Sequence, residues 1–83
     1  MDMITKDSVE EAYSFFHQKW NLYQLMDNDS VRDHIEYTIS NYAEAMSVEL
    51  YTRLAAGKPD FLHDHSNFAG DLSAAVQRLE DLL

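Results

Sequence analysis

Glycine and proline, the residues that most often interrupt regular backbone, are scarce in this chain: its 83 residues include two glycines and one proline. No run alternates apolar with polar residues in the way that a half-buried strand requires. Apolar residues recur instead at steps of three and four, the spacing that places them on one face of a helix. These features predict an all-α fold.

The first helix is predicted over residues 6–26, where apolar residues keep the helical spacing. Thr5 is the expected N-cap, because its hydroxyl can accept a hydrogen bond from a free backbone N–H group of the first turn, and Ser8 with Glu11 offers a competing capping box three residues on. The apolar stripe of this helix includes Phe16 and Trp20. Trp20 is therefore expected to be largely buried, and Trp20→Ala to lower the free energy of unfolding by about 3–5 kcal/mol.

The second helix is predicted over residues 31–56, after a polar turn at 27–30 that supplies capping side chains. Gly57 in the left-handed conformation, followed by Pro59, is expected to end this helix. Its apolar residues follow one another at steps of four and three: Val31, Ile35, Ile39, Tyr42, Met46, Leu50 and Leu54.

The third helix is predicted over residues 59–83, where three sets of apolar positions repeat every seven residues. His65 shares its position in the repeat with Leu72 and Leu79, which predicts a histidine at the edge of the core. The alternative is a break near residues 63–67, because the run His-Asp-His-Ser-Asn consists of poor helix formers.

Three helices joined by two short loops predict an antiparallel three-helix bundle that forms a single domain over residues 1–83. A chain of this length buries only about 60% of the surface that it exposes when unfolded, so a deep enclosed active site is not expected. The absence of cysteine excludes disulfides, Cys-based zinc sites and thiol nucleophiles. No signal peptide and no membrane-spanning stretch are recognised, so a cytoplasmic protein is expected.

Fifteen acidic residues against six basic ones give the chain a formal net charge of −9. Such a field repels phosphate backbones, and the basic residues are scattered, so direct binding to nucleic acid is not expected. Acidity is compatible with a partner that has a basic surface, or with mimicry of nucleic acid. The simplest interpretation is that the acids solvate the outer faces of the helices.

His63 and His65 are weak candidates for metal ligands. In a helix, residues two apart point about 200° away from each other and cannot hold one ion. In a loop, the two histidines and a carboxylate such as Asp60 or Asp64 could bind Zn²⁺. The helical interpretation is preferred, so no metal and no cofactor are expected, and His65→Leu is expected to be tolerated. No catalytic motif occurs, so the chain is not expected to be an enzyme.

A second apolar line on the predicted helix 31–56 is the candidate interaction surface, and it lies well away from the main stripe. Its members are Tyr37, Val48, Tyr51 and Ala55. One interpretation is that neighbouring helices bury this line as part of the core. The other is that it stays exposed and binds a partner protein or a second copy of the chain, since tyrosine is favoured at interface centres.

The favoured function is that of a small acidic, non-catalytic helical module that acts by protein–protein interaction, with a homodimer as one form. The alternative is an acidic mimic of nucleic acid that inhibits a nucleic-acid-binding protein. A small metal-dependent enzyme ranks third, because it would require His63 and His65 to lie together in a loop.

Overall fold

The computed structural model describes residues 4–83, which form four α-helices and one short 3₁₀ helix. No strand occurs among these residues, so the all-α prediction is confirmed. The three-helix bundle is not confirmed, because the helix count is four. The elements are α1 (Lys6–Leu25), α2 (Asp29–Ala45), α3 (Val48–Ala55), η1 (His65–Asn67) and α4 (Phe68–Leu82).

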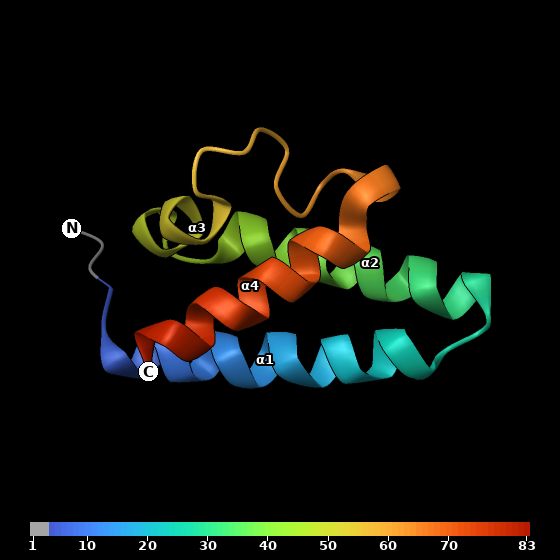
Figure 1. Cartoon of the computed structure of the whole chain (residues 1–83), viewed down its shortest axis with the longest axis horizontal. Coiled ribbons are helices and arrows are strands. Elements are labelled where there is room, and N and C mark those ends of the chain that lie inside the picture. Colours follow the sequence, from blue (N-terminus) through green and yellow to red (C-terminus); the bar gives the residue numbers. More distant parts are fainter. Residues whose placement is uncertain (1–3) are drawn as a thin grey trace.

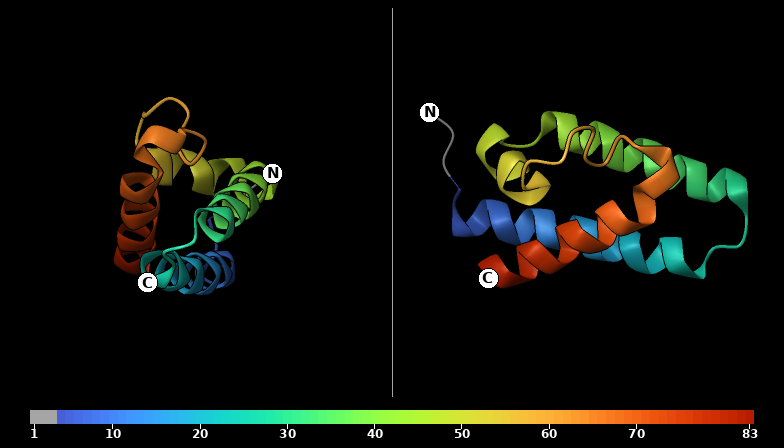
Figure 2. Two further views of the ribbon diagram at one scale, coloured as in Figure 1. Left: turned by 90° about the vertical axis from the view of Figure 1, so that its right-hand side faces the viewer. Right: turned by 45° about the horizontal axis from the view of Figure 1, so that its top comes forward.

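The long helices lie lengthwise in a body that measures 39 × 23 × 19 Å. α1 and α2 run antiparallel, and α4 returns beside α1 in the opposite direction (Figure 1). The pairing of α1 with α4 is the most extensive contact between elements. The end-on view in Figure 2 shows α1, α2 and α4 around a common interior, with α3 and the loop of residues 56–67 across the top. We refer to residues 56–67 as the long loop.

The core draws side chains from each of the four α-helices and from the long loop. Among the residues with no exposed surface are five large side chains, one from each α-helix and one from the long loop, namely Phe16, Ile39, Leu54, Leu62 and Leu72. Burying an apolar side chain of this size contributes about 1.5–3 kcal/mol. The interior is therefore the main source of stability, as expected for a chain without disulfides.

Short polar side chains start the first two helices. Thr5 is the N-cap of α1, as predicted, and it forms a reciprocal capping box with Ser8. Asn28 caps α2, where its side-chain oxygen accepts hydrogen bonds from the backbone N–H groups of Ser30 and Val31. The second helix thus begins at Asp29, two residues before the predicted start.

The prediction of one helix over residues 31–56 is wrong, because the chain turns at Met46 and Ser47. Both residues have extended backbone ψ angles, 170° at Met46 and 129° at Ser47. The Ser47 hydroxyl accepts a hydrogen bond from the Leu50 N–H group at 3.4 Å and so caps a new helix, α3. Serine competes for backbone N–H groups in this way, which explains the break inside a continuous apolar repeat.

The prediction of a helix over residues 59–83 is wrong in its first third, because α4 begins only at Phe68. The alternative break near 63–67 is closer to the structure, although the irregular segment starts earlier. Gly57 has the left-handed conformation predicted for it, with φ of 83°. Three other residues also have positive φ angles that a helix does not allow: Ala56, Asp60 and Leu62.

Side chains from three helices hold the long loop in place. Leu62 donates its N–H group to the buried Asp71 carboxylate at 3.0 Å, and its carbonyl accepts from the Ser40 hydroxyl at 2.7 Å. The Phe61 carbonyl accepts from the Tyr51 hydroxyl at 2.7 Å. A buried backbone group needs a hydrogen-bond partner, and here side chains replace the partners that a helix would supply. Phe61 and Leu62 therefore enter the core from a loop.

Trp20 is partly buried and packs against the core, although it is more exposed than the buried positions of α1. The fully buried positions of α1 are Val9, Ala12, Phe16 and Tyr23, which places Trp20 at the edge of the stripe, with its ring stacked against Tyr23.

Among residues 4–83, none of the helices combines the length and the apolar character that crossing a membrane would demand.

Candidate interaction surface

The four residues of the predicted apolar line lie in different environments. Tyr37 on α2 and Val48 at the start of α3 are 65% and 68% exposed. Tyr51 is half-buried and Ala55 is buried against the core. The turn at Met46 and Ser47 separates Tyr37 on α2 from the other three residues on α3. The four residues therefore do not form the continuous line that a single straight helix would present.

Tyr51 has a structural task in this arrangement. Its hydroxyl donates to the Phe61 carbonyl, and its ring packs edge-on against the Phe61 ring with centroids 6.0 Å apart. Burial, and next the charges of Asp60 and Asp71, raise the pKa of the Tyr51 phenol. A charged substitution at this position would disturb the fold as well as any interface.

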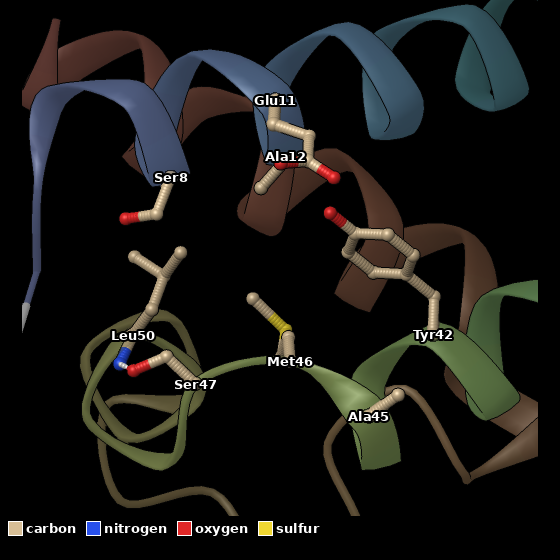
Figure 3. Close-up of a pocket in the computed structure, with 8 residues that line it drawn as sticks. All are labelled: Ser8, Glu11, Ala12, Tyr42, Ala45, Met46, Ser47 and Leu50. Atoms are coloured by element: carbon tan, nitrogen blue, oxygen red, sulfur yellow. Dashed lines mark hydrogen bonds between the residues drawn. The ribbon is translucent and has the colours of Figure 1, made fainter. Parts of the chain in front are cut away.

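A hollow of about 210 Å³ lies between the first turns of α1 and the α2–α3 turn (Figure 3). Met46 points into it from the turn, and Glu11 of α1 and Tyr42 of α2 face each other across its far end. Burial, and next the Glu11 carboxylate, raise the pKa of the Tyr42 phenol. The lining residues are Ser8, Glu11, Ala12, Tyr42, Ala45, Met46, Ser47 and Leu50.

Two further hollows adjoin the same turn. One, of about 230 Å³, shares Met46 with the first hollow and is also lined by Glu44, Val48 and Tyr51. The other is wide and shallow, and its lining includes Val48 and Glu49. Val48 and Met46 are thus each common to two hollows. We define the junction surface as Glu11, Glu44, Met46, Val48 and Glu49.

The junction surface combines apolar and acidic groups. Met46 and Val48 lie where the hollows meet, and each hollow is lined by one carboxylate, from Glu11, Glu44 or Glu49. These carboxylates come from three different helices, α1, α2 and α3. Arg53 and His63 are the basic side chains that line these hollows.

A separate polar cluster ties the end of the long loop to α1 and α2. Glu36 is only 7% exposed, and its carboxylate accepts from the Tyr23 hydroxyl at 2.7 Å and contacts His65 Nδ1 at 2.5 Å. The hydrogen bond to Glu36 and its charge raise the pKa of His65. The Arg32 guanidinium lies over the Tyr23 ring, 4.3 Å from its centroid. This arrangement fixes the loop, and neither Glu36 nor His65 lines any of the three hollows.

The two candidate metal ligands have different partners. His63 lies near the Tyr51 ring, with centroids 6.5 Å apart, whereas His65 Nδ1 contacts Glu36. In the part of the chain from residue 4 onward, no three His, Cys, Asp or Glu side chains are grouped closely enough to hold a metal ion. His65 also does not occupy the core-edge position inferred from Leu72 and Leu79, since 73% of its side chain is exposed.

Sequence reasoning missed the roles of Glu36 and Asp71. Both signals were present, because Glu36 lies three residues before the buried Ile39, and Asp71 lies four residues before the buried Ala75. A carboxylate on the buried face of a helix needs a hydrogen-bonding partner, which predicts a contact without identifying it. The partners are His65 and the Leu62 N–H group. Both lie in the long loop, where a helix was predicted.

No protein-family model, curated protein or solved structure matches this chain.

Proposed function

We propose that the protein is a small acidic, non-catalytic helical module that acts by binding another protein through the junction surface. The observation that carries this proposal is the position of Val48, which is 68% exposed at the edge of two hollows. Exposed apolar side chains beside concave surface are typical of interface centres, where a partner covers them. Met46, which lines two of the hollows, adds an adaptable apolar contact.

The charges at the junction surface favour a different protein over a second copy of this chain. A two-fold dimer through the same patch would bring Glu11, Glu44 and Glu49 of both copies together. Like charges that face each other across an interface are unfavourable. The acidic-mimic alternative is supported less well, because these carboxylates surround an apolar centre and do not form a row along one helix.

The proposal is tested by Val48→Ser, with Val31→Ser as the matched control on another exposed valine, 40% accessible at the start of α2. Both changes should alter the free energy of unfolding by less than about 0.5 kcal/mol, because the sites are exposed. Proteins captured from the native host by the immobilised chain should be lost with Val48→Ser and kept with Val31→Ser. Equal capture by both variants would contradict the proposal. Sedimentation equilibrium of the purified chain identifies the homodimer, should that form instead.

A further inference from the structure

The first hollow of the junction surface has apolar walls and, at one end, two polar groups that are open to solvent. Met46, Leu50 and Ala12 provide apolar contact (Figure 3). The hydroxyls of Ser8 and Ser47 are engaged by the caps of α1 and α3. Across residues 4–83, the Glu11 carboxylate and the Tyr42 hydroxyl have no hydrogen-bond partner. An occupant that satisfies this site needs an apolar stem and a cationic, hydrogen-bonding end.

Lysine and arginine side chains have this chemistry. Their methylene stems pack along apolar surface while the charged end reaches a polar group. The hollow, with a volume of about 210 Å³, opens to solvent and leaves room for one such side chain. A charge-assisted hydrogen bond to Glu11 would then replace solvent at the end of the hollow.

The second hollow extends the same pattern along the surface. It shares Met46 with the first, and it presents Val48 beside the Glu44 carboxylate. A single amine would fill only one of these positions, whereas a peptide segment can present two cations with an apolar side chain between them. The net charge of −9 favours approach of such a segment and opposes approach of an acidic one.

We propose that the junction surface accepts a basic amphipathic segment of the partner protein, with a Lys or Arg side chain in the hollow at Glu11 and an apolar side chain against Val48. This inference rests on the proposed function and specifies the chemistry of the partner. The second cation of the segment pairs with Glu44. Met46 lies between the two positions and contacts both side chains.

The probe is a short, fluorescently labelled peptide of lysine and leucine, patterned as an amphipathic helix. Two counterparts replace every leucine with serine or every lysine with glutamate. When each labelled peptide is titrated with the whole chain, only the lysine–leucine peptide should show the increase in fluorescence anisotropy that indicates binding. Equally tight binding of the lysine–serine peptide would mean that charge alone is recognised; that result would overturn the inference and favour the acidic mimic.

Adjacent carboxylates provide the decisive control. Glu11→Gln and Glu10→Gln remove the same charge from neighbouring residues of α1, but only Glu11 lines the hollow. Glu11→Gln should weaken binding of the lysine–leucine peptide about five- to tenfold, and Glu10→Gln less than twofold. Equal effects of the two changes would show that the peptide responds to the overall negative charge of the chain and not to a specific site, and would overturn the inference.

Experiments on Val48→Ser distinguish failure of this inference from failure of the proposed function. If host partners are lost with Val48→Ser but the lysine–leucine peptide does not bind, the proposed function stands and the basic-segment inference fails. If the peptide binds and Val48→Ser weakens its binding while Val31→Ser does not, the inference is supported at the same surface. Peptide binding that is unaffected by Val48→Ser would overturn it.

Discussion

Replacing Asp71 with alanine tests how the long loop is held against α4. Asp71 is 3% exposed, and its carboxylate accepts the Leu62 N–H group at 3.0 Å and pairs with the Lys58 ammonium. Leu62 is fully buried with φ of 64°, a left-handed conformation that costs about 1–2 kcal/mol for a residue other than glycine. The carboxylate therefore stabilises a strained residue that contributes its whole side chain to the core.

The magnitude follows from the two contacts. Loss of a hydrogen bond between a charged group and a backbone amide that is left buried costs about 1.5–3 kcal/mol. The pair with Lys58 adds at most about 1 kcal/mol, because the Lys58 side chain is 35% exposed and water screens its charge. Asp71→Ala should thus lower the free energy of unfolding by about 1.5–4 kcal/mol, a large part of the ~4–12 kcal/mol expected for a domain of this size.

The assay is urea unfolding followed by far-ultraviolet circular dichroism. Asp71→Asn keeps an acceptor for the Leu62 N–H group and should lose only about 1 kcal/mol. Glu80→Ala, at an exposed position of the same helix, should change stability by less than about 0.5 kcal/mol. A loss below about 0.5 kcal/mol for Asp71→Ala, with an unchanged dependence on urea, would refute the assignment of Asp71 as the loop anchor.

Three further predictions use the same unfolding assay. Phe16→Ala should cost about 3–5 kcal/mol because Phe16 has no exposed surface, whereas Trp20→Ala should cost less, about 1–3 kcal/mol, because Trp20 is half-buried; equal losses would contradict this order. Glu36 raises the pKa of His65, so the folded chain holds this proton more tightly than the unfolded chain. The contribution of His65 to stability should be fully present below about pH 6.5 and be lost as pH rises through the folded-state pKa. His65→Gln should flatten this dependence, and a variant that keeps the full slope would exclude His65 as its source. Ala56→Gly should raise stability by up to about 1 kcal/mol, because Ala56 ends α3 with φ of 50°; a loss of stability would show that this conformation carries no strain.

The parts of the fold that were predictable from sequence are those set by near neighbours. The capping box at Thr5 lies within four residues, and the buried face of α1 follows from the periodicity that includes Phe16. The break at Ser47 was missed because the apolar spacing runs through it without a change of phase. The Ser47 hydroxyl caps the new helix there. Serine is a common N-cap, but a prediction from apolar periodicity alone does not take caps into account.

The parts that were not predictable depend on residues far apart in the chain. Leu62 fits the seven-residue repeat of α4, yet it reaches the core from a loop. Its backbone N–H and carbonyl groups form hydrogen bonds with the side chains of Asp71 and Ser40. The expectation that His65→Leu would be tolerated came from the same repeat, and it overlooked Glu36. The junction surface was likewise out of reach, since it exists only where α1 meets the α2–α3 turn.

The extensive pairing of α1 with α4 has a consequence for the order in which the chain folds. These are the first and last helices of the described chain, and α1 has fewer contacts with α2, its neighbour in sequence. During synthesis at ~5–20 residues per second, α1 is complete roughly 3–11 s before residue 82 is added. Throughout that interval the part of the apolar face of α1 that packs against α4 has no final partner. Folding should therefore be a late, concerted event governed by long-range contacts, slower than in bundles whose helices pair in sequence order.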